Sequence, residues 1–402
     1  MMGICWLLSE NRHEIPWRTV LTGLGMQFLL AVLLIKLPFT QTLFTAMNQV
    51  VLVLDQAATA GTTFVFGYLG GGEPPFTPAN PANLFILAFK ALPLIIVVSA
   101  MSALLFYWRV LPWIVKQLAR LLTHSMGIGG ALGLGAAANI FVGMIEAPLF
   151  IRPYLAKLSR AELFTLMTTG MATIAGTMMV LYASILSDIR ADALGQILAA
   201  SVISIPAALV IAMILVPGKG RGDVTEAEIR SDATSSMDAI TQGTLDGVKL
   251  LINVIAMLIV FVSLVALVNI LLALLPEING EPITLQRILG ILFAPLVWLM
   301  GIPANEVLVA GSLMGFKTIL NEFLAYLQLV ALPEGRLSAR SEMIMIYALC
   351  GFANFGSLGI MLGGMGTMIP ERRTEIAALG IKSILAGTLA TMMTGAFVGI
   401  LY

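Results

Sequence analysis

Apolar runs without a charged side chain recur along the chain, and they predict membrane-spanning helices. A transmembrane helix needs about 20 mostly apolar residues. Residues 19–38 reach this length, because Lys36 lies near one end, where its side chain can extend to the membrane surface. Residues 1–8 are too short to span, and we interpret them as the stub of a shortened first helix. The strongest candidates for single helices are six uncharged runs: 91–108, 163–187, 193–218, 250–276, 343–370 and 383–402.

The composition agrees with a multi-pass membrane protein. Of the 402 residues, 11% are charged, and 59% are apolar. Soluble domains carry roughly 25% charged residues, so a water-soluble fold is excluded. The 22 basic and 22 acidic side chains give a formal net charge of zero, which argues against nucleic acid as a partner. Two cysteines and two histidines are too few for a disulfide framework and do not resemble a metal site.

Charged flanks predict a re-entrant hairpin in the first half of the chain. Residues 109–124 and 152–160 carry Arg and Lys without an acidic side chain, so the positive-inside rule places both on the cytoplasmic side. Residues 127–151 between them are almost wholly apolar and must therefore enter and leave the membrane on one side. We expect the bend near Glu146-Ala147-Pro148, because proline interrupts a helix. Such a bend needs protein around it or a cavity beside it.

The second half contains a counterpart. Residues 288–330 form two apolar pieces around residues 301–306, which predicts a second hairpin that enters from the outside. Interrupted segments at matching places indicate a transporter with inverted repeats and a site near the membrane midplane. We divide the chain into N-terminal helices and interfacial segments (1–108), the first hairpin repeat with its following helices (109–218), a solvated cytoplasmic linker (219–249), and a scaffold helix, second hairpin and C-terminal helices (250–402).

Three carboxylates stand inside apolar sequence. A charged side chain at the bilayer centre costs about 2.5–3.5 kcal/mol on insertion scales, so such residues are usually functional. Glu146 has the alternative of a pair with Arg152, and Glu322 has the alternative of a pair with Lys317. Glu306 adjoins the predicted break at Pro303, where a structural role is equally plausible.

Two asparagines share this apolar setting. Asn139 follows three alanines, and Asn354 lies within an uncharged run of aromatic and small residues. An amide in such a place can bond a neighbouring helix or bind a ligand. On spacing alone, both readings stay open for both residues.

The motifs around these residues resemble the concentrative nucleoside transporters. The segments 138–154 and 317–326 resemble the two hairpins of that family, and 171–176 and 350–357 resemble the helices that follow them. Residues 61–67 and 370–373 match more weakly. The likeness runs in order along nearly the whole chain.

The resemblance implies an all-α membrane fold with about eight transmembrane helices, two re-entrant hairpins and interfacial helices. It implies a homotrimer in which each protomer has its own pathway. A scaffold part forms the trimer contact, and a transport part with the hairpins and broken helices moves like an elevator.

The resemblance also implies a substrate site. The family carries Gly-Gln-Thr-Glu on the first hairpin, against the nucleobase, whereas this chain has Gly143-Met144-Ile145-Glu146. Methionine offers only a weak sulfur acceptor in place of the glutamine amide, so base discrimination should loosen or shift. The sugar-contacting positions of the family are matched by Glu322, Asn354 and Ser357, and Phe352 matches a position near the base or sugar.

A cation site follows from the same resemblance. Its family positions correspond here to Asn139, Val142, Thr173 and Ile174, which are all compatible with sodium. Some relatives couple to protons instead, and Glu322 or Glu146 could then titrate. Ala304 departs from the tryptophan that relatives often carry after the proline, which could change gating.

We therefore expect a cation-coupled nucleoside importer of a bacterial inner membrane, with sodium favoured over protons and no bound cofactor. The same fold with a modified nucleoside or another ribosyl compound as substrate is the alternative. A polytopic membrane enzyme is remote, because it would need a metal cluster, paired aspartates or a nucleophile with a base, and Asp55 stands alone in its apolar region.

Overall fold

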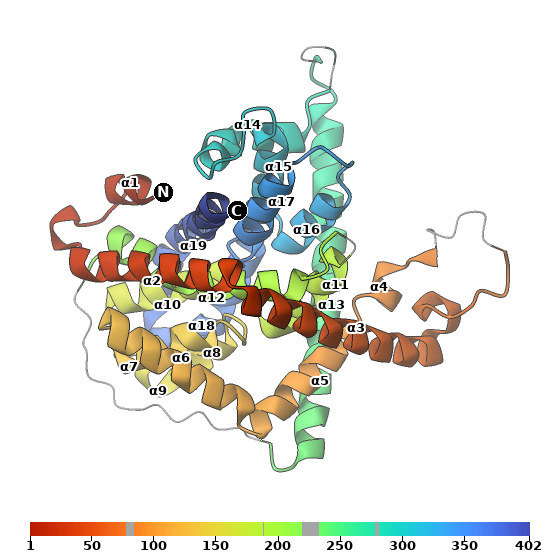
Figure 1. Ribbon diagram of the computed structural model, residues 1–402, viewed down its shortest axis with the longest axis horizontal. Coiled ribbons are helices and arrows are strands. Elements are labelled where there is room, and N and C mark those ends of the chain that lie inside the picture. The colour runs from red at the N-terminus through yellow and green to blue at the C-terminus, as the bar shows by residue number, and fades with distance from the viewer. Residues whose placement is uncertain (78–83, 188, 219–232, 278–279, 281) are drawn as a thin grey trace.

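The computed structural model describes residues 1–77, 84–187, 189–218, 233–277, 280 and 282–402 (Figure 1). These described residues are mainly helical and contain no β-strand. Seven of their helices or helix pairs are long and apolar enough to cross a membrane. The predicted all-α membrane fold is therefore confirmed. Residues 219–232 of the predicted linker lie outside the described residues.

The first quarter of the chain forms two long helices in sequence. Helix α2 runs over Trp17–Lys36, and α3 begins two residues later and runs over Pro38–Phe66. Figure 1 shows α3 continuing away from the bundle beyond the end of α2. Asp55 lies within α3, so the apolar stretches on its two sides form one helix. The short elements of this region are α1 (Met2–Leu7), η1 (Arg12–Glu14), η2 (Gly67–Gly70) and α4 (Leu87–Lys90).

The longest helix, α13 (Ser236–Leu272), begins inside the predicted linker and packs against α5 (Leu94–Tyr107). Most of its apolar side chains are exposed or half-buried, so much of its surface meets lipid or another protein. Its apolar surface contrasts with α12 (Ala193–Leu215), most of which is buried. Figure 1 shows α13 running the length of the molecule and α12 at its centre.

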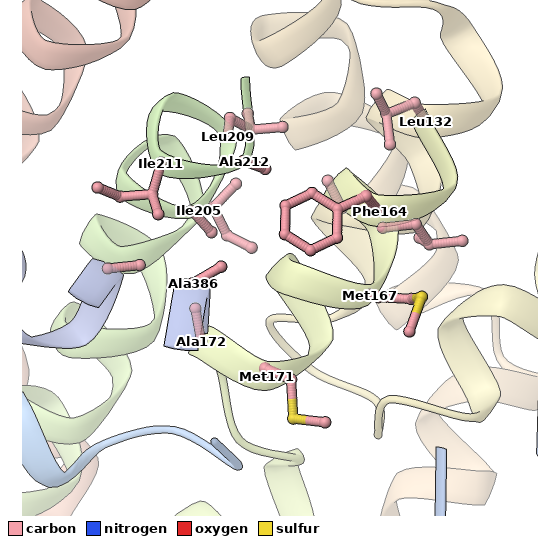
Figure 2. Packing of buried hydrophobic residues seen from close by; sticks show 14 of the residues in the cluster. Leu132, Phe164, Met167, Met171, Ala172, Ile205, Leu209, Ile211, Ala212 and Ala386 are labelled. Carbon is pink, nitrogen blue, oxygen red and sulfur yellow. The ribbon is translucent and has the colours of Figure 1, made fainter. Parts of the chain in front are cut away.

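The core around α12 joins segments that are far apart in sequence. Helix α12 contacts α2, α10 (Arg160–Ala172) and α19 (Arg373–Leu401). Figure 2 shows Phe164 of α10 between Leu132 of α7 (Gly130–Ala138) and the α12 side chains Ile205 and Leu209. Close van der Waals packing of these apolar side chains holds the first hairpin against α10, as is usual between helices in a membrane.

Two runs predicted as single helices are broken, which corrects the prediction. Residues 163–187 divide into α10 and α11 (Gly176–Leu186), because Thr173 and Ala175 have extended backbones. Residues 343–370 divide into α17 (Ala339–Leu349) and α18 (Phe355–Met368). Uninterrupted hydropathy could not reveal either break, since the residues at the breaks are themselves uncharged.

The first hairpin bends earlier than predicted. Helix α7 ends at Ala138, and α8 (Glu146–Phe150) begins at Glu146, so the non-helical turn is formed by residues 139–145. Pro148 lies inside the first turn of α8, where a proline lacks only a hydrogen bond that would be unmade anyway. The short helix α9 (Arg152–Leu155) follows, and the amphipathic α6 (Val110–Met126) precedes the hairpin.

The second half has two turns where one was predicted. Helices α14 (Leu285–Trp298) and α15 (Val307–Ile319) pack against each other around the predicted break at 301–306. A further break at Leu320-Asn321 separates α15 from α16 (Glu322–Val330). The carboxylate of Glu322 is therefore carried by the α15–α16 hairpin. Segment η4 (Pro370–Arg372) joins α18 to α19.

Candidate functional site

Backbone hydrogen bonds join three of the helix breaks directly. The Gly176 amide, at the start of α11, donates to the Phe141 carbonyl in the turn of the first hairpin, at 2.9 Å. The Phe352 amide, in the α17–α18 break, donates to the Thr173 carbonyl at 3.1 Å. A Cβ at position 176 would lie 2.7 Å from the Phe141 oxygen, so only glycine allows this approach. Backbone N–H and C=O groups at the three breaks thus form hydrogen bonds with one another. An apolar environment requires this, because it offers no water as a partner.

The Asn139 side chain is held with its oxygen free. Its Nδ2 donates to Thr169 Oγ1 at 3.1 Å, and the residue is only 1% exposed. Its Oδ1 is buried and has no hydrogen-bond partner among the described residues. A buried amide oxygen without a donor is uncommon in folded proteins and can bind a cation.

Two carbonyl oxygens near Asn139 are also open. Among the described residues, no hydrogen bond reaches the carbonyl oxygen of Val142 or of Ile174. Thr173 uses its hydroxyl to donate to the Thr169 carbonyl at 2.9 Å, and its own carbonyl accepts from Phe352. The four residues predicted as a cation site therefore all lie at or beside two breaks that contact each other.

Glu322 is held by donors from two other elements. Tyr182 of α11 donates its hydroxyl to Oε1 at 2.6 Å, and Asn354 donates Nδ2 to Oε2 at 2.8 Å. Glu322 is 4% exposed. Asn354 is also the N-cap of α18, because its Oδ1 accepts from the Ser357 amide at 2.7 Å. The structure thus brings together the carboxylate, amide and hydroxyl residues that the resemblance assigned to the sugar.

Lys317 does not neutralise Glu322 by a direct ion pair. Its ammonium donates to the Ala348 carbonyl at 2.8 Å and to Thr391 Oγ1 at 2.7 Å, and the residue is fully buried. Lys317 thereby ties α15 to the C-terminal end of α17 and to α19. A cation near the last carbonyls of a helix is favourable because these groups carry partial negative charge.

On the first hairpin, the side chain of Glu146 is exposed, whereas those of Met144 and Ile145 pack against other helices. Glu146 is exposed, and its carboxylate folds over Gly143 so closely that a Cβ there would collide. Met144 packs against Gly170 of α10, and Ile145 packs against Gly364 of α18. These two side chains therefore make packing contacts between the hairpin and its neighbours. Among the described residues, Glu146 forms no ion pair with Arg152, which removes that alternative.

The contacts of Glu306 agree with the structural role that its place beside the break suggested. It precedes the first residue of α15, and its Oε2 accepts from Ser338 Oγ at 3.2 Å. Phe352 is half-buried in the α17–α18 break beside this group of sites.

Tyr182 was not singled out by the sequence. The only signal was one phenolic hydroxyl in a mostly apolar helix, because a buried tyrosine hydroxyl usually finds a partner. Thr169 and Thr391 were likewise missed, because threonine is common in membrane helices.

Comparisons with known proteins identify the family. The family model "Na+ dependent nucleoside transporter C-terminus" matches residues 196–399, its N-terminal counterpart matches 1–69, and "Nucleoside recognition" matches 88–188.

Related proteins match over almost the whole chain. The uncharacterized transporter YutK of Bacillus subtilis is 36% identical, over 99% of this chain and 96% of its own. The nucleoside permease NupC of Helicobacter pylori is 32% identical, over 99% and 94%. The structure of CNTnw in an inward-facing substrate-bound state is 34% identical, with a TM-score of 0.91, over 99% of this chain and 94% of that chain. The protein therefore belongs to the concentrative nucleoside transporter family and is a multi-pass, cation-coupled nucleoside importer, not an enzyme.

Proposed function

We propose that the helix breaks form one transport site in which sodium binds at Asn139 and a nucleoside binds between Glu146 and Glu322. The observation that carries the proposal is the buried, unpartnered Oδ1 of Asn139 at the contact between two breaks. Neutral oxygens from an amide and from backbone carbonyls suit a hard cation. The open carbonyls of Val142 and Ile174 and the hydroxyl of Thr173 complete the proposed donor set.

The sugar half of the proposed site uses Glu322, Asn354 and Ser357. A carboxylate offers about four lone-pair positions, and two of those on Glu322 are already occupied by Tyr182 and Asn354. The remaining two can accept the hydroxyl protons of a ribose diol. Phe352 supplies an aromatic face in the same break. The exposed carboxylate of Glu146 would face the nucleobase from the first hairpin.

Cation and substrate are coupled in this proposal through the shared breaks. Sodium at Asn139 would fix the hairpin turn that directly precedes Glu146, and the Phe141–Gly176 bond would transmit this order to α11, which carries Tyr182. A cation that orders the substrate site strengthens substrate binding, and the linkage is reciprocal. The prediction is a sodium-dependent affinity for nucleosides.

We propose that the site accepts nucleosides with a broad range of nucleobases. Met144 and Ile145 pack against α10 and α18, so the first hairpin offers the base fewer polar partners than Gln and Thr would. This observation favours the second candidate, a site that accepts modified bases. Competition of uridine uptake by a panel of natural and base-modified nucleosides tests it. Strict rejection of every modified base would contradict the proposal.

We propose a homotrimer in a bacterial inner membrane as the working form. The support is the apolar surface of α13, on which large side chains such as Ile259, Val262 and Leu267 are exposed. Cross-linking of the purified protein in lipid, followed by mass measurement, tests the trimer. A monomeric mass would contradict it.

The decisive test of the residue roles is uptake of labelled uridine by the reconstituted protein. Glu322→Gln should lower uptake strongly, since a carboxylate oxygen becomes a donor amide. Asn139→Leu should weaken the sodium dependence, because the free oxygen is lost. Glu306→Gln is the matched control, as this buried carboxylate lies in the α14–α15 turn, where it contacts Ser338 and none of the proposed site residues. Unchanged uptake in Glu322→Gln, or an unchanged sodium response in Asn139→Leu, would refute the corresponding role.

A further inference from the structure

We propose that Thr169 of α10 is a positioning residue for the cation, which holds the Asn139 amide and the Thr173 hydroxyl with their oxygen lone pairs open. This inference rests on the proposed sodium site and deepens it. It assigns part of the sodium affinity to a side chain that need not contact the ion itself.

The hydroxyl of Thr169 determines which way the Asn139 amide faces. Thr169 Oγ1 donates its one proton to the Leu166 carbonyl at 2.8 Å, so toward Asn139 it can act only as an acceptor. The amide atom that lies 3.1 Å from it must therefore be the donor, Nδ2. The amide oxygen then lies on the other side of the group, where it is buried and has no partner among the described residues.

The backbone of Thr169 acts on the second residue of the proposed cation site. Helix α10 ends at Ala172, so the Thr169 carbonyl is one of the last four, which have no amide partner within the helix. The Thr173 hydroxyl donates to this carbonyl at 2.9 Å, and this bond uses its only proton. Within the part of the chain that the structure describes, Thr173 Oγ1 accepts no hydrogen bond. Its lone pairs therefore stay available to a cation.

Close packing of α7 on α10 fixes Asn139 beside Thr169. Thr169 is 0% exposed, and a Cβ at Gly135, one turn before Asn139, would lie 2.7 Å from Leu166 Cδ1. The backbone amide of Asn139 donates to the Gly135 carbonyl at 3.1 Å. Asn139 is thus held at its backbone by α7 and at its side chain by α10. A site whose oxygens are already in place loses less freedom when the ion binds.

Loss of the Thr169 hydroxyl should weaken sodium binding. Beside a valine, Nδ2 of Asn139 would be a buried donor without its acceptor, and the amide would turn toward another one. Sodium binding would then have to turn the amide back and leave Nδ2 unpaired. The cost is about that of one neutral hydrogen bond, so the sodium affinity should fall about three- to tenfold.

Thr168 provides a matched control. It is the preceding residue of the same helix and is also 0% exposed, and its hydroxyl donates to the Phe164 carbonyl at 2.8 Å. Thr168→Val and Thr169→Val each remove one buried hydroxyl and its bond to a carbonyl of α10. Only the second removes the acceptor of Asn139. Thr169→Ser restores this acceptor and serves as the conservative rescue.

Two sodium titrations measure the effect, with choline replacing sodium at constant ionic strength. The first follows the melting temperature of the purified protein without nucleoside, because an ion that binds only the folded state raises it. The second follows uridine uptake into proteoliposomes. Thr169→Val should raise the half-saturating sodium concentration about three- to tenfold in both titrations and keep wild-type uptake at saturating sodium. Thr168→Val and Thr169→Ser should match the wild-type protein in both.

An unchanged half-saturating sodium concentration in Thr169→Val would overturn the inference, and so would an equal rise in Thr168→Val. Failure of Thr169→Val to fold, while Thr168→Val folds, would make Thr169 a structural residue and would overturn it too.

Asn139→Leu separates this inference from the proposed function. If Asn139→Leu keeps the wild-type sodium response, the cation site itself is wrong, and the role of Thr169 falls with it. If Asn139→Leu loses that response and Thr169→Val retains the wild-type sodium affinity, only the role of Thr169 is wrong.

Discussion

The buried ammonium of Lys317 allows a stability prediction with an internal control. Its two acceptors are the Ala348 carbonyl and Thr391 Oγ1. Thr391→Val keeps the shape of the side chain and removes one acceptor from a fully buried cation. A neighbouring threonine of α19, Thr388, has a buried hydroxyl with no partner among the described residues. Thr388→Val therefore removes a hydroxyl that contributes no hydrogen bond.

The magnitude follows from these contacts. A hydrogen bond to a charged group contributes about 1.5–3 kcal/mol. Thr391→Val should lower the free energy of unfolding by about that amount, which is roughly a 10- to 100-fold change in the unfolding equilibrium at 1.4 kcal/mol per tenfold. Thr388→Val should be neutral or slightly stabilising, because a buried hydroxyl without a partner is unfavourable.

The assay is reversible unfolding of the purified protein in mixed micelles, titrated with a denaturing detergent and followed by tryptophan fluorescence. The difference between the two variants is the informative quantity, since both replace threonine by valine on one helix. Equal losses in the two variants would refute the argument, and so would a neutral Thr391→Val. In either case the buried ammonium would have to be satisfied by other groups.

Two further predictions concern the contacts between elements. Gly176→Ala should abolish transport, since its Cβ would lie 2.7 Å from the Phe141 carbonyl oxygen; wild-type uptake in this variant would contradict the contact between the breaks. Burial alone would raise the pKa of Glu10, but Arg160 and Lys382 outweigh it and lower that pKa below its usual value of 4.5. The stabilisation from Glu10 is therefore present above pH 4.5 and lost as the pH falls through the lowered pKa. Glu10→Gln should remove this acid sensitivity in unfolding measurements, with an effect of about 0.2–1 kcal/mol because the pair is partly exposed.

The apolar pattern predicted the continuous helix α12 but missed the breaks inside two other apolar runs. The span 193–218 became α12 with little change in its bounds, although Pro206 lies inside the helix, because neighbouring helices allow a membrane helix to tolerate proline. The runs 163–187 and 343–370 looked equally continuous, yet both are broken. Their breaks are stabilised by hydrogen bonds to other breaks, and such distant partners leave no mark in local hydropathy.

The site residues likewise divide into those that the sequence predicts and those that only the fold brings together. The carboxylates Glu146 and Glu322 stand out from the sequence because an isolated charge in a membrane is costly. Charge flanks located the first hairpin, although its bend lies at 139–145 and not at the proline. The partners of Glu322 could not be predicted from the residues alone: Tyr182 is 140 positions away, and only the packing of α11 on α16 brings its hydroxyl to the carboxylate.

The central claim is that sodium drives nucleoside import through this site. The most direct measurement is uptake of labelled uridine into proteoliposomes in which the sodium gradient and the pH gradient are set separately. We predict that uridine accumulates whenever an inward sodium gradient is present, at any pH gradient, and that Asn139→Leu loses this accumulation. Accumulation driven by a pH gradient without sodium would contradict it.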